Sequence, residues 1–323
     1  MIEKIAKNFY MITLPMPFRL EHIHVFALVY DGQVALFDTG LNIPESFSKL
    51  EESLRTIGKS IHDIDRIFIT HSHADHCGMA GRIKDISGAI IYMSKISKQF
   101  IQRRQKREKT VIARINNFYS QHGLSERTIN GLIRLLAGFK KVTAPFEIDI
   151  CLEPGENLTI GDRKFEIIST PGHTSGHISF FFREDRVLLS GDHVLPDITP
   201  NLSPDLFQPD FRPLKSFLDS LTLIQNLPVE MVCPAHGNPF PNLKQRVEEI
   251  KEHHRERKGL ILESVKEEPK TTYQVSLDIF GRDLPEFDKF LALNETYVHL
   301  VELIQEGVIE ERRGIQSTLY AIR

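Results

Sequence analysis

The sequence lacks the features that mark several classes of protein. Its three cysteines, Cys77, Cys151 and Cys233, are too few and too scattered for a disulfide framework or a cysteine-based zinc knuckle. No run approaches the roughly 18 apolar residues of a membrane-spanning helix. Residues 1–16 mix charged with apolar side chains, unlike a signal peptide. We therefore expect a soluble globular protein of a reducing compartment, the cytoplasm, that does not bind membranes.

The chain also lacks a strong excess of charge of either sign. It has 40 Lys and Arg against 43 Asp and Glu over 323 residues, for a net charge of −3. This balance excludes a protein whose whole surface attracts nucleic acid, although it is compatible with a local basic patch. At roughly 150 residues per domain, the length predicts about two domains, or one large domain with an appendage.

The first 241 residues alternate between strand and helix patterns. Two apolar runs within 23–37 flank Asp31-Gly32, a dipeptide typical of a tight hairpin turn. Apolar residues within 45–57 recur with helical spacing. This alternation predicts a layered α/β architecture. Short apolar runs predict further strands at 66–70, 90–93, 164–170, 178–182, 186–191 and 229–235.

Two segments interrupt the alternation. Residues 94–142 are helical throughout, in about three helices divided at Gly123 and Gly138. Residues 196–213 contain five prolines, which predicts an irregular loop. The stretch 95–114 has one acid, Glu108, against eight basic residues: Lys95, Lys98, Arg103, Arg104, Lys106, Arg107, Lys109 and Arg114.

After residue 241 the pattern changes to that of a small separate unit. We place a boundary there, with domains at 1–241 and 242–323. The helix at 286–306 has five acids against one base, a net charge of −4, so we expect no binding to duplex DNA, because a DNA-reading helix is basic. Helix patterns at 243–265, 271–281 and 285–307, followed by two short strands within 308–322, have the order of a winged-helix unit.

Histidine and aspartate residues recur directly after predicted strands. The segment HSHADH, residues 71–76, follows the strand at 66–70 and offers four candidate metal ligands within six residues. His173, Asp192 and His236 each follow a later strand. The carboxyl ends of strands are where α/β folds place their chemistry, so the repetition predicts one shared site.

These motifs resemble those of the metallo-β-lactamase superfamily of hydrolases. The resemblance rests on HSHADH, on the later PGHT, GD and AHG segments and on the early FDTG, and covers about residues 10–241. It implies an αββα sandwich with two metal ions at one edge, and it leaves the substrate open. It also implies the ligands: His71, His73 and His173 for the first metal, Asp75, His76 and His236 for the second, and Asp192 as the bridge.

The residue types themselves suit metal-assisted hydrolysis. Five imidazoles and two carboxylates are ligands for two divalent ions, with Zn²⁺ as the first choice and Fe or Mn as alternatives. Two cations lower the pKa of bound water, supply hydroxide at neutral pH and polarise a carbonyl or phosphoryl oxygen. No Ser or Cys nucleophile is then required. Asp75 is either a ligand only or also the catalytic group that carries a proton to the leaving group.

Three further polar residues are candidates around the site. Asp38, in FDTG, is expected to orient a ligand histidine through a hydrogen bond, with a turn-capping role as the alternative. His24 either lines the pocket or is a half-exposed strand histidine. His193 follows Asp192 and points either to the substrate or away from it.

The two appended segments have open roles. The basic insert is either a solvated helical face, as charge runs usually are, or a lid that attracts anionic substrates such as phosphoesters, CoA thioesters or RNA. The resemblance favours the lid position. The C-terminal unit resembles the winged-helix appendage of some hydrolases of this superfamily, including a mitochondrial group with single-stranded RNA endonuclease activity. We expect it to serve in packing or in formation of a homodimer, and to complete the pocket wall.

The leading hypothesis is a binuclear metal hydrolase that uses a metal-bridging hydroxide on a small ester, lactone or thioester. The alternative is a metal-dependent phosphodiesterase or single-stranded RNA endonuclease of the same fold. A redox role like that of flavodiiron proteins is disfavoured, because His73 stands where they use a carboxylate. A persulfide dioxygenase with one iron stays an alternative, whereas a binding module without turnover is disfavoured by the intact set of ligands.

Overall fold

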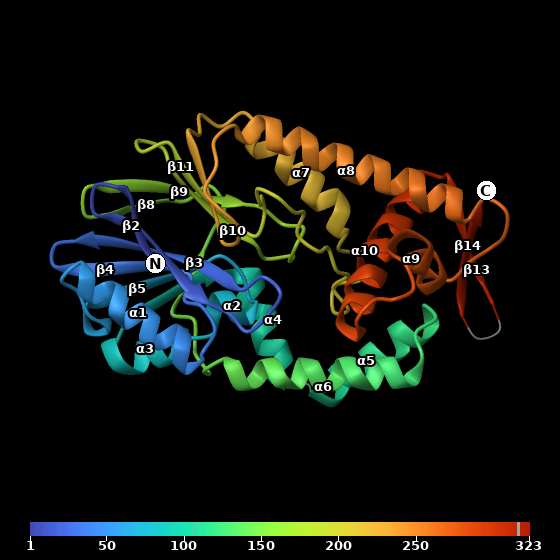
Figure 1. Ribbon diagram of the computed structural model, residues 1–323, viewed down its shortest axis with the longest axis horizontal. Helices are drawn as coiled ribbons and strands as arrows, with labels where there is room; N and C mark the ends of the chain where they lie inside the picture. The colour runs from blue at the N-terminus through green and yellow to red at the C-terminus, as the bar shows by residue number, and fades with distance from the viewer. Residues whose placement is uncertain (107, 315–316) are drawn as a thin grey trace.

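The computed structural model describes residues 1–106, 108–314 and 317–323, without the side chains of 104–109. Four bases and the acid of the predicted basic stretch, Arg104, Lys106, Arg107, Lys109 and Glu108, therefore lie outside the described side chains. Two sheets face each other with helices on their outer sides, so the predicted αββα sandwich is confirmed (Figure 1).

The first sheet has seven strands in chain order. The β3–β4 hairpin turns at Asp31-Gly32, where both residues have positive φ, as the sequence predicted. The pairing is antiparallel from β1 to β4 and parallel from β4 to β7. Its outer face carries α1 (Pro44–Thr56) and α3 (Ala80–Ser87) (Figure 1). The strands are β1 (Ile2–Ala6), β2 (Phe9–Pro15), β3 (His22–Tyr30), β4 (Gln33–Phe37), β5 (Ile64–Ile69), β6 (Ile90–Ser94) and β7 (Ile150–Leu152).

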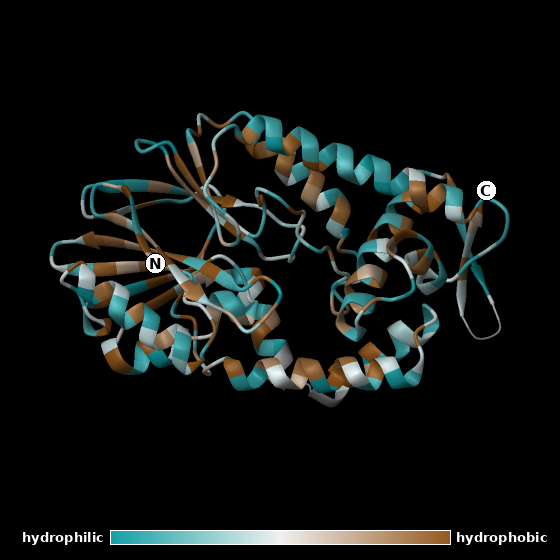
Figure 2. Cartoon of the chain, viewed as in Figure 1, coloured by the Kyte–Doolittle hydropathy of each residue, from teal (hydrophilic) through white to brown (hydrophobic). Residues whose placement is uncertain are grey.

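The second sheet has the order β12-β11-β10-β9-β8, and α7 (Pro213–Ile224) and α8 (Leu243–Ser264) cover it. Only the β11–β12 pair is parallel. Helix α8 turns a mostly hydrophilic face outward (Figure 2) and buries Leu243, Val247 and Ile250 against α7 and the sheet. The strands are β8 (Asn157–Ile160), β9 (Arg163–Ser169), β10 (Ile178–Phe182), β11 (Val187–Gly191) and β12 (Met231–Pro234).

Phenylalanine rings fill the space between the two sheets. Phe37 from β4 stacks on Phe68 from β5, with ring centroids 5.0 Å apart, and meets Phe180 from β10 edge to face at 5.1 Å. Both sheets thus contribute to one buried cluster. Burial of each such ring stabilises the fold by about 1.5–3 kcal/mol, so this cluster is a main source of the stability of the sandwich.

The insert forms three helices, and both of its predicted dividers lie at helix ends. The helices are α4 (Lys95–Lys106), α5 (Glu108–Gln121) and α6 (Glu126–Phe139). Gly123, with φ of 95°, follows α5 and ends it. Gly138 is the second-to-last residue of α6, which is followed by a 3-10 turn at Lys140–Val142.

The C-terminal unit has the helix and strand order predicted for it. It consists of α8, α9 (Thr272–Phe280), α10 (Glu286–Gln305) and the ribbon of β13 (Ile309–Arg313) and β14 (Thr318–Ile322). Helix α10 packs against α6 of the insert through Leu293 and against the second-sheet cluster through Val298. The boundary near 241 and the winged-helix assignment stay predictions. Among the described residues, no helix is long and apolar enough to cross a membrane.

Close packing of α3 gives a test of the sandwich. A Cβ added to Gly81 would overlap the backbone carbonyl of Pro145, whereas one added to Gly138 meets nothing. We expect Gly81→Ala to lower the free energy of unfolding by about 1–3 kcal/mol, measured by urea denaturation. Gly138→Ala is the control and should be neutral or slightly stabilising. Equal stability of both variants would contradict this packing.

Candidate metal centre

The predicted ligands meet at one edge of the sandwich. Strand β5 leads into the segment 71–76, and α2 (Ala74–Cys77) begins within this segment. Strands β9, β11 and β12 lead to His173, Asp192 and His236, respectively. Backbone bonds join the pieces: the Ile178 N–H donates to the Thr70 carbonyl across the two sheets, and the Ala235 N–H donates to the Gly191 carbonyl. The sheets therefore fix where each ligand-bearing loop starts.

One group of ligand atoms comes from His71, His73, His173 and Asp192, which lie within 4.8 Å of one another. His73 Nδ1 is 3.0 Å from His71 Nε2 and 2.9 Å from His173 Nε2. Asp192 Oδ2 is 3.4 Å from His173 Nε2. These are the first-metal residues that the resemblance implied.

The second group comes from Asp75, His76 and His236, again within 4.8 Å of one another. Asp75 Oδ2 lies 3.4 Å from His236 Nε2. The other oxygen of Asp192, Oδ1, lies 3.4 Å from His76 Nε2 and 3.5 Å from His236 Nε2. Asp192 thus presents one oxygen to each group.

Unsatisfied buried atoms show that this cluster fits a cation. His76 Nε2, His236 Nε2 and Asp192 Oδ1 are buried without any hydrogen-bond partner, although such groups normally have one. All three atoms are good ligands for divalent metals. The types of ligand atom and their lack of hydrogen-bond partners therefore fit the metal ions that the fold implies.

Hydrogen bonds at the far side of each ring orient the histidines. The Nδ1 atoms of His76, His173 and His236 lie 2.8–2.9 Å from the Asp38 carboxylate and the carbonyl oxygens of Asn201 and His22, respectively. An N–H donated there leaves Nε2 with its lone pair toward the cluster. Asp38 also accepts from the Thr70 N–H at 2.8 Å and from the Thr70 hydroxyl.

Charge in the cluster divides the histidines into two kinds. Burial lowers the pKa of His71 and His173 and lowers that of His73 to about 3, so these rings are neutral. Burial also opposes a charge on His76, but Asp192, Asp38 and Asp75 raise its pKa well above 6.5. The pKa of His236 is raised as well, chiefly by Asp192 against the effect of burial. Without metal, His76 and His236, which lie beside the carboxylates, are therefore the histidines that hold protons.

The remaining sequence candidates lie behind the cluster. His24 is buried, with Nε2 at 2.8 Å from the Gly237 carbonyl and Nδ1 at 3.1 Å from the Thr13 hydroxyl. The half-exposed alternative for this residue is therefore wrong: at the β2–β3 pairing the ring is covered by the loop after His236. His193 is fully buried against the Phe217 ring and belongs to neither ligand group.

Two supporting residues escaped the sequence analysis. His177 is buried behind Asp192 and accepts the Asp192 backbone N–H through Nε2 at 3.2 Å. Asn201, whose carbonyl receives His173, lies in the proline-rich loop. Only the GHTSGH repeat of glycine and histidine hinted at His177, and nothing local pointed to Asn201.

Helix α10 holds the loop that carries Asn201. The Asn201 side chain donates to the Leu291 carbonyl at 2.9 Å, and the Leu202 N–H donates to Glu295 Oε2 at 3.0 Å. Asn294 donates to the Ser203 hydroxyl at 3.0 Å. The C-terminal unit therefore influences the orientation of His173 through Asn201, which contacts both.

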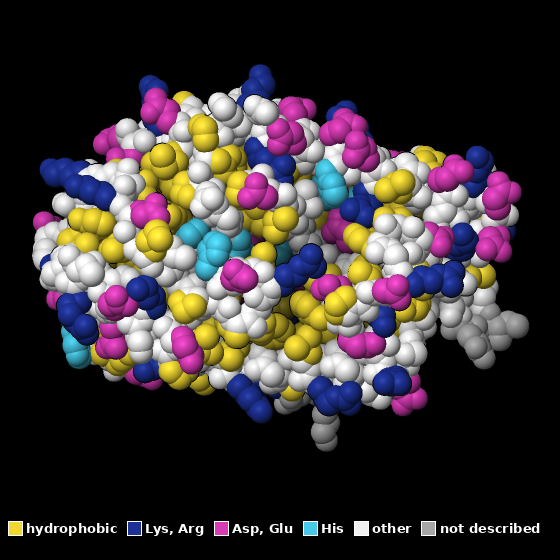
Figure 3. Space-filling model, in the orientation of Figure 1, with side chains coloured by type: hydrophobic (Ala, Val, Ile, Leu, Met, Phe, Trp, Pro, Cys, Tyr) yellow, Lys and Arg dark blue, Asp and Glu magenta, His cyan; other side chains and the backbone are white. Residues whose placement is uncertain are grey.

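The insert borders the site at its first turn. Ser97 and Phe100 of α4 line a small crevice of about 100 Å³ together with His73, His173 and Asp205. Of the described bases, Lys98 donates to the Ile148 carbonyl and Arg114 to the Leu206 carbonyl. Figure 3 shows histidines reaching the surface near the middle of the face, with charged side chains beside them.

The comparisons with known proteins agree with this geometry. Residues 19–236 match the family model described as the metallo-beta-lactamase superfamily, and the chain belongs to this superfamily. Its relatives include a probable metallo-hydrolase, YqjP, of Bacillus subtilis, at 27% identity over 92% of each chain. A beta-lactamase-like protein 2 homolog of Caenorhabditis elegans is 28% identical over 92% of this chain and 83% of that protein.

A solved structure covers nearly the whole chain. A metallo-beta-lactamase family protein from Thermus thermophilus superposes with a TM-score of 0.87 at 28% identity, over 99% of this chain and 100% of that one. A shorter match, 42% identical over 45 residues or 14% of this chain, is to a hydroxyacylglutathione hydrolase of Methylococcus capsulatus. The protein is a metal-dependent hydrolase of this superfamily.

Asp38 offers a test of how the ligands are oriented. We expect Asp38→Asn to weaken metal binding about 10-fold or more, within the 10–100-fold range for such partners, because it removes the charge opposite His76 Nδ1. Competition with a chromophoric chelator measures this. Asp31→Asn is the matched control, since Asp31 also has positive φ but is exposed in the hairpin turn. Equal affinities in the two variants would refute the orienting role.

Metal binding should also release protons. The pKa of His76 and that of His236 are raised, so each ring keeps its proton to a higher pH, and a metal ion must displace it. The apparent affinity for Zn²⁺ should therefore rise with pH above about pH 6.5, the ordinary pKa of histidine, as these rings lose their protons. Calorimetric titration in two buffers of different ionisation enthalpy measures the protons released. Binding heats that are independent of the buffer would contradict the charge distribution.

Proposed function

We propose that this hydrolase holds two divalent metal ions and acts on a small ester, lactone or thioester. Zn²⁺ is the first candidate, with Fe or Mn as alternatives. Two bound cations would supply hydroxide at neutral pH and stabilise the negative charge that develops on the substrate oxygen. The single observation that carries the proposal is the position of Asp192, which turns a different oxygen to each group of ligands.

Each residue has a defined part in this proposal. His71, His73 and His173 would hold the first ion, Asp75, His76 and His236 the second, and Asp192 both. Asp75 is partly exposed, and burial would raise its pKa, but His76 and His236 lower it to about 2. It is therefore a carboxylate at neutral pH, and its exposed position suits a further role in which it passes a proton to the leaving group.

The thioester alternative has support from the names of two relatives. The Methylococcus capsulatus protein and a protein of Rhizobium etli, 27% identical over 51% of this chain, are both named hydroxyacylglutathione hydrolases. These matches span about half of the chain or less, so they support a class of substrate and no particular compound.

A second candidate is a phosphodiesterase or single-stranded RNA endonuclease. The observation that favours it is the crevice beside His73, which opens next to the basic insert. Duplex DNA is disfavoured as a partner, because the acidic helix α10 buries Leu293, Leu300 and Leu303 in the protein and presents no basic face. We keep a small molecule as the leading partner, with a homodimer as a prediction.

Loss of the bridge tests the function directly. We expect Asp192→Ala to lower the metal content from about two ions per chain, the number in two-metal sites, and to abolish hydrolysis of whichever ester, lactone, thioester, phosphodiester or RNA the wild type cleaves. Metal analysis of protein purified without chelator and a hydrolysis screen are the measurements.

Asp219→Ala on α7 is the control, because this carboxylate is exposed and pairs with Lys215. Full metal content and activity in Asp192→Ala would sink the two-metal proposal. Cleavage of RNA alone would put the second candidate in place of the first.

A further inference from the structure

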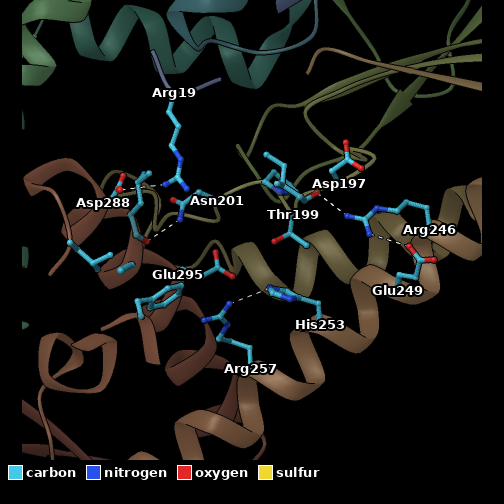
Figure 4. Close-up of a pocket in the computed structure, with 16 residues that line it drawn as sticks. Arg19, Asp197, Thr199, Asn201, Arg246, Glu249, His253, Arg257, Asp288 and Glu295 are labelled. Carbon is cyan, nitrogen blue, oxygen red and sulfur yellow. Dashed lines mark hydrogen bonds and ion pairs between the residues drawn. The ribbon is translucent and has the colours of Figure 1, made fainter. Parts of the chain in front are cut away.

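A cavity of about 490 Å³ lies beside the C-terminal helices and is separate from the crevice at the ligands. It is formed by α8, α10 and the segment 197–201, with Arg19 and Phe280 at its sides (Figure 4). This volume is within the usual range for small-molecule sites. It adjoins the metal centre through Asn201, whose carbonyl receives the His173 ring at 2.8 Å.

Two of the three arginines that line the cavity are already paired. Arg19 lies 3.5 Å from Asp288, and Arg246 lies 3.1 Å from Glu249. Arg246 also donates to the carbonyl oxygens of Leu195 and Ile198.

The third arginine, Arg257, has no carboxylate within 4.0 Å among the described residues. Its guanidinium stacks 4.3 Å over the Phe280 ring and makes one long contact, 3.4 Å, from Nη2 to His253 Nε2. Burial lowers its pKa, with Glu295 opposing, but a guanidinium stays charged in proteins. Most of its donors are therefore free to bind an anion that enters the cavity.

Glu295 lines the same cavity and is 6% exposed. Its Oε2 accepts the Leu202 N–H, and its Oε1 has no hydrogen-bond partner. Burial raises the pKa of Glu295 to about 7, against the effects of the Leu202 N–H and of Arg257. This carboxyl is therefore about half protonated at neutral pH, which reduces the negative charge that it presents to an anion in the cavity.

We propose that the cavity binds the oxyanion of a small molecule, a carboxylate or a phosphate, with Arg257 as its charged partner. The anion supplies the countercharge that the guanidinium lacks among the described residues within 4.0 Å. The further assignment of this anion to the substrate, as an ester or thioester that carries an acidic group, rests on the proposed function. The anion site itself does not.

A metal ion is the rival occupant. His254, Glu295 and His299 have ligand atoms within 4.8 Å of one another. However, His254 Nδ1 and His299 Nε2 are 3.0 Å apart and satisfy each other by a hydrogen bond, and the charge of Arg257, which lines the same cavity as Glu295, would repel a cation. Asp288 and Glu249 are paired with arginines, and Asp197 lines another part of the cavity wall, so the anion is assigned to Arg257.

The test is anion binding to the metal-loaded protein. Inorganic phosphate and acetate are titrated separately at constant ionic strength, and binding is followed by the shift in Tm. We expect Arg257→Gln to weaken binding of at least one anion 10-fold or more, about 1.4 kcal/mol, with a smaller loss in Arg257→Lys. Arg255→Gln is the control on the same helix, since Arg255 is exposed and pairs with Glu252.

The outcomes separate the alternatives. The anion that loses more affinity in Arg257→Gln identifies the oxyanion, and loss of both supports the shared site. Equal binding in wild type and Arg257→Gln would overturn the proposal, as would a third Zn²⁺ equivalent that disappears in Glu295→Gln. If Arg257→Gln fails to fold, Arg257→Met decides in the same way, because it keeps an unbranched stem beside Phe280 and removes the charge.

Kinetics test the assignment to the substrate. For an ester with an acidic group, Arg257→Gln should raise KM 10-fold or more with kcat little changed, whereas a neutral ester should show no change in KM. If Arg257→Gln loses anion binding but the wild type hydrolyses no ester, the anion site is supported and the proposed function is contradicted. Hydrolysis with an unchanged KM for the acidic ester would remove the substrate assignment.

Discussion

The rest of the site depends on one buried carboxylate that faces two sets of histidines. Asp192 lies within 3.5 Å of His76, His173 and His236, all nearly buried, and its Oδ1 has no hydrogen-bond partner. Lone pairs and charge that converge in this way are unfavourable in a protein interior unless cations lie between them. The ligands lie at the edge of the sandwich, outside the phenylalanine cluster, so their unfavourable burial does not disturb the hydrophobic core. Metal binding would therefore order the loops that carry the ligands.

Distant parts of the chain hold this cluster in place. Asp38 at the end of β4 fixes His76, His177 behind β10 accepts the Asp192 N–H, and the carbonyl of Asn201 fixes His173. Each contact joins segments that are 15 to 38 residues apart. The ring orientations are therefore a property of the assembled sandwich, and they explain why a short motif alone does not define the metal centre.

The sequence predicts what local patterns encode. The Asp31-Gly32 turn, the strand before HSHADH and the amphipathic side of α8 each depend on neighbouring residues, and the structure has them where the patterns indicate. His24 shows the limit, because packing of the surrounding chain decided whether its ring was covered. Asn201 was beyond reach for the same reason: its role comes from α10, some 90 residues later.

The insert, the proline-rich loop and the C-terminal unit meet at Asn294. Its side chain is fully buried, accepts the Tyr119 hydroxyl at 2.8 Å and donates to the Ser203 hydroxyl. Its neighbour Glu295 binds Leu202 on one side and lines the cavity on the other. Glu295 thus holds Leu202, and the preceding residue, Asn201, orients His173. Helix α10 therefore contacts both the loop at His173 and the proposed anion site, and a catalytic domain without α10 would lack this connection.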